Sequence, residues 1–183
     1  MSTLPYREIW PKIGDSAFIA PGAWIIGDVV IGDRSSIWFN CVVRGDVNFI
    51  RIGADTCVQD NSTLHVTEPK YPLRIGDRVV IGHRALVHGC VLEDECMIGM
   101  GAIILDGAKV GKGSIVAAGA LLPPGFEVPP ETLVMGSPAK TVRKTGDAER
   151  ELIHHSWAHY AELASEYLGG GRESEGKVRG FLR

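Results

Sequence analysis

Aliphatic residues recur at every sixth position along most of this chain. The first run consists of Ile13, Ile19, Ile25, Ile31, Ile37 and Val43. Comparable runs begin at Ile52, Ile75 and Leu92. Neither an α-helix, with 3.6 residues per turn, nor a strand that alternates at every second residue produces a strict period of six. A short strand followed by a turn does produce it, so each unit is expected to form one side of a coil.

Three such sides close a triangular coil of about 18 residues, and stacked coils pair their strands into parallel sheets. The composition agrees, because the chain is 45% hydrophobic but only 7% aromatic and contains 23 Gly. Stacked aliphatic side chains fill a narrow core, and pairs such as Gly32-Asp33 suit tight corners. The sequence therefore predicts a mainly β fold, a triangular β-helix of about seven coils. The period is interrupted at residues 44–50, at residues 66–74 and by a short step after Val87, and insertions are expected to leave the prism as loops.

The periodicity ends at Val134, and the chain then changes character. Residues 147–168 place apolar side chains at spacings of three and four, which is typical of an α-helix that buries one side. We expect a β-helix domain over residues 1–140, a C-terminal helix within 141–171 packed on an apolar side of the prism, and a flexible tail over 172–183.

The charge of the chain argues against several classes of function. There are 19 Lys and Arg residues against 22 Asp and Glu residues, and no basic run is present to neutralise phosphates. A nucleic-acid partner is therefore not expected. No apolar stretch of about 18 residues and no signal peptide are recognisable, so we expect neither membrane insertion nor secretion. The four cysteines lack metal-ligand spacing, and reduced, partly buried thiols agree with a cytoplasmic location.

Three of the six histidines, His65, His83 and His88, lie within the repeats. His65 directly follows the core residue Leu64, and His88 directly follows Val87, so these two hold the same position in their units. Their separation is one coil of about 18 residues plus about five residues of an interrupting loop. We expect them to stack on neighbouring coils about 4.8 Å apart, with both rings facing outward, where two imidazoles can share a metal ion.

His83 follows Ile81 by two residues, which places it near a corner and away from the other two histidines. From there it can reach the His65 and His88 of a neighbouring chain. Three such contacts close a trimer with three interfacial metal sites. A row of solvated histidines on the outside of the prism is the alternative interpretation of the same pattern.

Further motifs accompany these histidines, namely Arg44-Gly-Asp46, Gln59-Asp60-Asn61, the segment 82–90 and Ile98-Gly-Met-Gly101. Together they resemble the γ-class carbonic anhydrase family, especially its short bacterial members, over roughly residues 6–168. The resemblance implies a left-handed β-helix and a homotrimer. It also implies reversible hydration of carbon dioxide to bicarbonate by hydroxide formed at a Zn²⁺ ion, with Fe²⁺ or Co²⁺ as alternatives. The implied metal ligands are His65, His83 and His88.

The same resemblance implies roles for residues around the metal. Arg44 and Asp46 would form a salt bridge between subunits, and Gln59 would hydrogen-bond the water or bicarbonate at the metal. Asp60 would orient the arginine or the water. Tyr160, on the C-terminal helix, matches a tyrosine that some members bring near the active site, and it equally fits the apolar stripe of that helix.

The chain departs from the archetype of this family at positions that serve proton transfer. Val47 and Asn48 replace a glutamate, and the 66–74 loop is short, with Glu68 as its only acidic residue. A proton shuttle needs a pKa near the working pH, so we expect a slow or conditionally active enzyme. The alternatives are a metal-dependent acyl-CoA thioesterase, a hexapeptide acyltransferase that uses one histidine as its base, and a structural trimer without chemistry.

Overall fold

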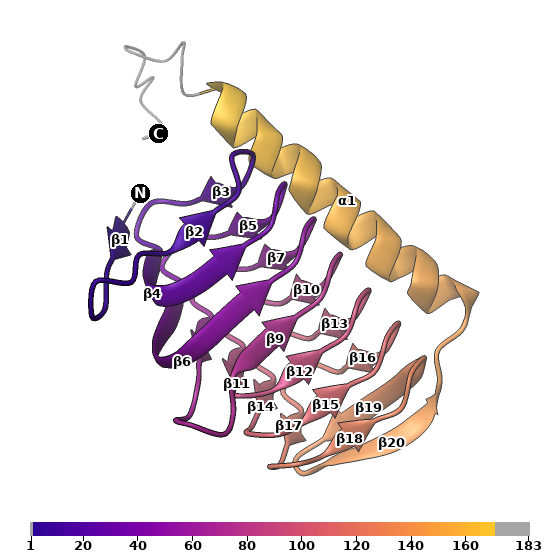
Figure 1. Cartoon of the computed structure of the whole chain (residues 1–183). Helices are drawn as coiled ribbons and strands as arrows, with labels where there is room; N and C mark the ends of the chain where they lie inside the picture. The colour runs from indigo at the N-terminus through magenta and orange to yellow at the C-terminus, as the bar shows by residue number, and fades with distance from the viewer. Residues whose placement is uncertain (1, 171–183) are drawn as a thin grey trace, which may run out of the picture.

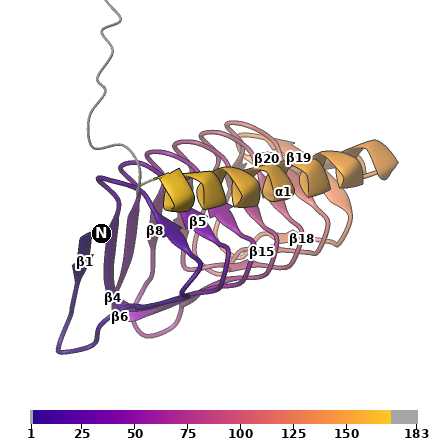
Figure 2. The ribbon, with the colours of Figure 1, turned by 90° about the horizontal axis from the view of Figure 1, so that it is seen from above.

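The computed structural model describes residues 2–170, and the tail predicted over 172–183 lies outside this range. The described chain forms a parallel β-solenoid of about seven turns with one helix alongside (Figure 1), which confirms the predicted mainly β prism. Figure 2 shows the solenoid from above, with the helix running along one side of the coils. Within residues 2–170, no helix combines the length and the apolar character that a membrane crossing requires.

The coils stack their strands into three faces. The helix-covered face consists of β3 (Phe18–Ile19), β5 (Ser36–Ile37), β7 (Cys57–Val58), β10 (Val80–Ile81), β13 (Met97–Ile98), β16 (Ile115–Val116) and the hairpin strands β19 (Thr132–Gly136) and β20 (Ala139–Lys144). The open face consists of β1 (Ser2–Leu4), β8 (Thr63–His65), β11 (Leu86–His88), β14 (Ile103–Ile104), β17 (Leu121–Leu122) and the first halves of β4 (Trp24–Ile31) and β6 (Val42–Ile52). The polar face consists of the second halves of β4 and β6 with β2 (Lys12–Ile13), β9 (Leu73–Ile75), β12 (Val91–Leu92), β15 (Lys109–Val110) and β18 (Glu127–Val128).

The predicted aliphatic ladder forms the core. On the helix-covered face, Ile37, Val58 and Ile81 stack in register on successive coils and are completely buried. Successive residues of a strand point to opposite sides, so the residue before each core residue faces outward. These outward rows therefore decide what each face of the solenoid can contact.

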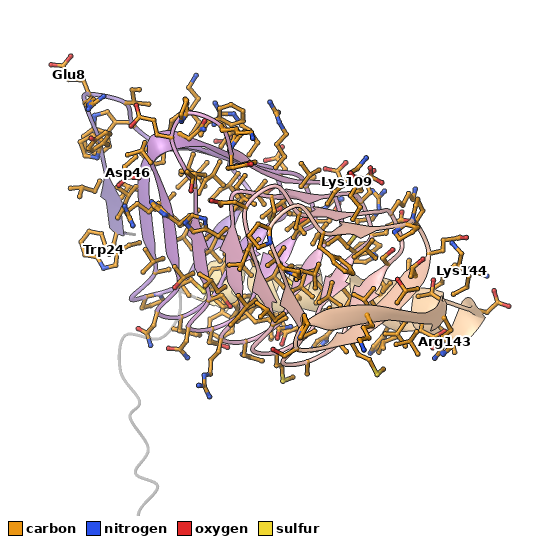
Figure 3. All side chains as sticks on the ribbon, turned by 90° about the horizontal axis from the view of Figure 1, so that it is seen from below. Glu8, Trp24, Asp46, Lys109, Arg143 and Lys144 are labelled. Atoms are coloured by element: carbon orange, nitrogen blue, oxygen red, sulfur yellow. The ribbon has the colours of Figure 1, made fainter. Side chains whose placement is uncertain are left out.

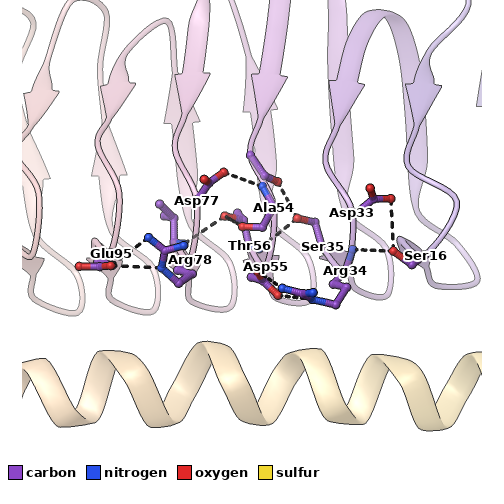
Figure 4. A network of polar contacts seen from close by, with 12 residues as sticks. Ser16, Asp33, Arg34, Ser35, Ala54, Asp55, Thr56, Asp77, Arg78 and Glu95 are labelled. Carbon is purple, nitrogen blue, oxygen red and sulfur yellow. Dashed lines mark hydrogen bonds and ion pairs between the residues drawn. The ribbon is translucent and has the colours of Figure 1, made fainter.

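The corners between the polar face and the helix-covered face are held by charged pairs (Figure 4). Arg34 adopts a positive φ of 54° and donates to Asp55 on the next coil at 2.7 and 2.6 Å. The glycines expected at these corners allow neighbouring coils to approach each other closely. A Cβ added at Gly32 would lie 2.6 Å from the carbonyl group of Gly53 on the next coil, so glycine permits the close stacking of the coils.

The two longer interruptions of the period take different forms. Residues 44–50 stay inside the long strand β6, which passes from the open face round a corner to the polar face, so the loop expected there does not form. The register between β4 and β6 shifts between Gly27 and Val29 and absorbs the extra residues. The second interruption does leave as a loop, which an antiparallel bridge between Thr67 and Tyr71 closes.

The helix α1 (Asp147–Gly170) packs along the helix-covered face, which confirms the helix predicted from the apolar spacing. Glu149 accepts hydrogen bonds from the backbone N–H of Gly146 and from the Arg143 guanidinium, both at 2.7 Å, and so caps the first turn. Farther along, the helix packs against Trp38 in a second apolar cluster. The helix thus covers apolar side chains that the strands of this face turn outward.

Candidate functional site

His65 and His88 lie side by side on the open face. The strands β8 and β11 pair in parallel register with His65 opposite His88, and the ring centroids are 5.0 Å apart. The Nδ1 atom of His65 faces the Nε2 atom of His88 at 2.9 Å. The predicted stacking of these two side chains on neighbouring coils is therefore confirmed.

A carboxylate lies behind each ring. The Nε2 atom of His65 is 3.1 Å from an oxygen of Asp46, and the Nδ1 atom of His88 is 2.6 Å from an oxygen of Asp106. Each imidazole thus turns one nitrogen toward a carboxylate and the other toward a shared point between the rings. A carboxylate on the second nitrogen fixes the tautomer and raises the basicity of the ligand, an arrangement common in protein metal sites.

The two facing nitrogens fit the requirements of a metal ion. A tetrahedral ion with bonds of about 2.05 Å separates its ligand nitrogens by about 3.3 Å, so the two nitrogens need to part by only about 0.4 Å. The pKa of His65 is lowered, because burial outweighs the nearby Asp46 carboxylate. The neutral imidazole that a metal ion requires is therefore the favoured form near neutral pH.

Asp46 is held in turn by Arg44, whose guanidinium forms an ion pair with the carboxylate. Burial alone would raise the pKa of Asp46, but hydrogen bonds from Arg44 and His65 lower it, so the carboxylate stays ionised. The resemblance implied a salt bridge between subunits. Within one chain the two residues already form a pair, because both side chains project from β6 two residues apart and so lie on the same side of the strand. The contact between subunits stays a prediction. Figure 3 places Asp46 toward the same end of the solenoid as Trp24, far from Lys144.

His83 lies elsewhere, at the corner between β10 and β11. Its Nδ1 atom is 2.8 Å from an oxygen of Asp60, which occupies the same corner of the preceding coil. Asp60 thus contacts His83, a partner that the resemblance did not suggest, and its role toward the arginine or the water stays a prediction. Among residues 2–170, no three His, Cys, Asp or Glu side chains form a group that can hold a metal ion. One chain thus presents a pair of histidines at one place and a single histidine at another.

Gln59 and Tyr160 lie on the same side of the molecule as His83. Gln59 directly precedes Asp60 and is 6% exposed. The ring of Tyr160, on α1, packs edge-on against Trp38 with centroids 5.4 Å apart. Burial raises the pKa of Tyr160, and nearby acidic groups, Asp60 among them, raise it further. Tyr160 therefore belongs to the apolar stripe of the helix and also lies close to the polar corner.

Asp106 is the candidate residue that the sequence patterns did not single out. It stands 18 residues after His88, which is one full coil, so the period that brings the histidines together also brings this carboxylate to them. Acidic residues are common at the corners of these coils. The period therefore shows that Asp106 lies near His88, but it does not separate this residue from acidic residues with only structural contacts.

The remaining histidines and the cysteines have no place in this site. His154, His155 and His159 are exposed on α1. The four cysteines are free, and they are more fully buried than the partly buried thiols that the sequence predicted. Burial raises the pKa of Cys41 to about 11 and that of Cys57 to about 12, so both remain thiols and not metal-binding thiolates.

Comparison with known proteins places this geometry in context. A family model described as bacterial transferase hexapeptide (six repeats) matches residues 11–45 and 89–124. The protein named carbonic anhydrase from Geobacillus kaustophilus is 50% identical over 163 residues, which cover 89% of each chain. Gamma carbonic anhydrase 1, mitochondrial, from Arabidopsis thaliana is 46% identical over 162 residues, which cover 86% of this chain and 59% of the plant protein.

A solved structure shows the same fold at high similarity. The X-ray structure of a Bacillus cereus protein, titled as a putative acetyltransferase, aligns with a TM-score of 0.90 and 43% sequence identity. The alignment covers 92% of this chain and 99% of the other. The solenoid and its helix therefore recur together in a protein of nearly the same extent.

Proposed function

This chain belongs to the γ-class carbonic anhydrase family of hexapeptide-repeat proteins, and we propose that it is a metal-dependent enzyme that interconverts carbon dioxide and bicarbonate. The observation that carries this proposal is the convergence of the His65 Nδ1 and His88 Nε2 atoms, each with a carboxylate behind its ring. A divalent ion held there, Zn²⁺ or in its place Fe²⁺ or Co²⁺, would supply an activated water at neutral pH.

We assign the third ligand to the His83 of a neighbouring chain in a homotrimer. The outward row of the open face supports this, because it is largely apolar and none of the described residues covers its exposed members. The row consists of Trp24, Val42, Thr63, Leu86, Ile103 and Leu121. Leu86 stands two residues before His88 on the same side of β11, so the row borders the histidine pair.

The corner that carries His83 offers a matching surface. The backbone N–H of Gly101 donates to the carbonyl oxygen of His83 at 2.8 Å, which stacks the next corner directly on it. Met100, at that next corner, is 60% exposed. Met100 lies near His83, and the apolar row lies beside His65 and His88. In this proposal the two surfaces are the complementary halves of one interface.

The surrounding side chains take the following roles in this proposal. Asp46 and Asp106 hold the ring nitrogens of His65 and His88 toward the metal, and Asp60 does the same for His83. Arg44 keeps Asp46 ionised, and its remaining N–H groups suit an anion such as bicarbonate. From the neighbouring chain, the Gln59 amide can hydrogen-bond substrate, and the Tyr160 hydroxyl, with its raised pKa, serves as a neutral donor.

Proton transfer sets the expected rate. Asn48 stands where an acidic shuttle is expected, and its amide already donates to the carbonyl oxygens of Thr67 and Pro69, both at 3.1 Å. The nearest loop carries Glu68, which is exposed. We therefore propose slow or conditional turnover in the cytoplasm, since a shuttle with a pKa near the working pH speeds the release of the proton.

Metal analysis of protein purified without an affinity tag tests the proposal. We expect about one divalent ion per chain, and its loss in His65→Ala, His88→Ala and His83→Ala. The matched control replaces His155 and His159 on α1, which should leave the metal content unchanged. Absence of bound metal under all conditions contradicts the proposal.

Kinetics then separate the possible substrates. Stopped-flow measurement should show hydration of carbon dioxide that depends on the metal. Hydrolysis of acyl-CoA thioesters without any hydration of carbon dioxide would keep the metal site but replace the substrate. Acyl transfer to an amine or alcohol by protein without metal would support the hexapeptide acyltransferases instead.

A further inference from the structure

The loop between β8 and β9 is held by several hydrogen bonds. The bridge between Thr67 and Tyr71 closes it with two backbone hydrogen bonds of 3.0 Å each. Asn48 of β6 reaches across and donates its side-chain amide to the carbonyl oxygens of Thr67 and Pro69. The short loop is therefore fixed from both ends and from the neighbouring strand.

The tyrosine of this loop lies across the next two coils. A Cβ added at Gly89 would stand 2.8 Å from the Cβ of Tyr71, and one added at Gly107 would stand 2.9 Å from its ring. Gly89 directly follows His88, and Gly107 directly follows Asp106. Glycine at both positions thus lets the loop lie directly over the coils that carry this histidine and this carboxylate.

One side chain of the loop reaches the site. The Thr67 hydroxyl donates to one carboxylate oxygen of Asp106 at 2.8 Å, while the other oxygen lies 2.6 Å from the Nδ1 atom of His88. With both oxygens engaged, the carboxylate cannot rotate freely about its broad terminal torsion. The result is a continuous chain of hydrogen bonds from the loop to the imidazole that faces His65.

We propose that the loop serves to hold His88 in its metal-binding orientation, with Thr67 as a positioning residue that acts through Asp106. This inference rests on the metal site proposed above. It gives the two histidines equivalent support, because Arg44 fixes the carboxylate behind His65 and Thr67 fixes the carboxylate behind His88. In this proposal, the loop formed by the interruption at residues 66–74 supports the metal site.

Three variants of the full-length protein test the proposal. In Thr67→Val the hydroxyl is lost at nearly constant volume, and we expect the Kd for Zn²⁺ to rise about tenfold, as for other groups that orient metal ligands. The visible absorption of bound Co²⁺ should change as well. Thr67→Ser restores the donor and should restore both readouts. The control Thr145→Val removes a buried hydroxyl that donates to the Gly113 carbonyl and should change neither.

The outcomes separate this inference from the proposed function. Wild-type protein that binds no metal contradicts the site itself. Wild-type protein that binds Zn²⁺, with the same Kd and Co²⁺ spectrum in Thr67→Val, overturns the role of Thr67 alone. If Thr67→Val does not fold, Asn48→Ala releases the same loop without changing the threonine, and an unchanged Kd in that variant also overturns the proposal.

Discussion

The helix-covered face and the open face are built alike but covered differently. On the first, the outward residues Phe18 and Val80 are 7% and 3% exposed, because α1 lies along the row. On the second, the outward residues Trp24 and Ile103 are 45% and 37% exposed, and Trp24 projects from the ribbon in Figure 3. Each row stands on a ladder of parallel strands of its own. Only the covering element differs.

The polar face shows how a solvent-exposed face of this fold is built. Its outward row includes Lys12, Arg51, Arg74, Lys109 and Glu127, which need no cover. The chain therefore solvates one face, covers the second with its own helix and leaves the third apolar. Because His65 and His88 lie on that third face, a second copy of the chain in the proposed trimer would cover the apolar row and complete the histidine site together.

The largest expected effect comes from a charge on the open face. Ile103 faces outward in the single chain, so Ile103→Asp should leave the solenoid folded. In the proposed trimer it would place a carboxylate against an apolar partner surface, at a penalty of several kcal/mol for each interface. We expect sedimentation to give one third of the wild-type mass, and metal content to fall to background.

The matched control places the same residue on the polar face. Lys12→Asp on β2 should keep the wild-type mass and the wild-type metal content. If Ile103→Asp also sediments as the wild type does, the open face is not an interface, and the assignment of His83 to a neighbouring chain fails with it.

The next effect tests whether the metal site is shared. His65→Ala and His83→Ala should each bind no metal alone, but a mixed trimer restores one intact site where the His65 of one chain meets the His83 of the next. Trimers that contain both variants are therefore predicted to hold metal at about one site in three. Co-expression of the two variants with separate tags and metal analysis of the mixed trimers checks this. Mixed trimers without metal would mean that the ligands come from one chain.

Sequence spacing reveals the solenoid because the signal is local and repeated. Each core residue such as Ile37 or Val58 directly precedes a corner, so a period of six follows from the geometry of one coil. The assignment of the faces is different. The covered row contains Ser36 and Cys57, and the open row contains Val42 and Thr63. The composition of the rows therefore does not predict which of them the helix covers. That choice depends on packing between distant parts of the chain.

In the site, too, some contacts follow from the local repeat and others depend on the fold as a whole. The stacking of His65 on His88 follows from register and was predictable. The course of the chain at Arg44 and Asp46 was not, because the interrupted period over residues 44–50 predicted a loop where the strand β6 continues. The contact of Asp106 with His88 was not predictable either. Many acidic residues lie at the corners of the coils, and the sequence does not show which of their carboxylates reaches the histidine.

Trp38 under the helix and Trp24 on the open face allow the two faces to be compared by the same substitution. Trp38 is 4% exposed and packs against Phe18, Tyr160 and Tyr167, so Trp38→Ala should lower the free energy of unfolding by about 3–5 kcal/mol. Trp24→Ala on the open face should instead weaken the trimer, with a smaller effect on the single chain. Urea unfolding and sedimentation at one fixed subunit concentration distinguish the two outcomes. Equal loss of folding stability in both variants would contradict the contrast between the faces.

The smallest effect concerns the cap that begins the covering helix. Hydrogen bonds from Arg143 and from the backbone N–H of Gly146 lower the pKa of Glu149 to about 2, below its ordinary value of 4.5. A carboxylate with a depressed folded-state pKa stabilises the fold fully above the unfolded value, and this stabilisation is lost as pH falls from about 4.5 toward about 2. Glu149→Gln lacks that ionisation, so the difference in helix content between wild type and variant should shrink across this window in an acid titration followed by circular dichroism. Because the pair is exposed to solvent, the shift in the acid midpoint should stay below about one pH unit and diminish in high salt. A constant difference between the two proteins from pH 7 to pH 2 would show that the charge of Glu149 does not help to hold α1 on its face.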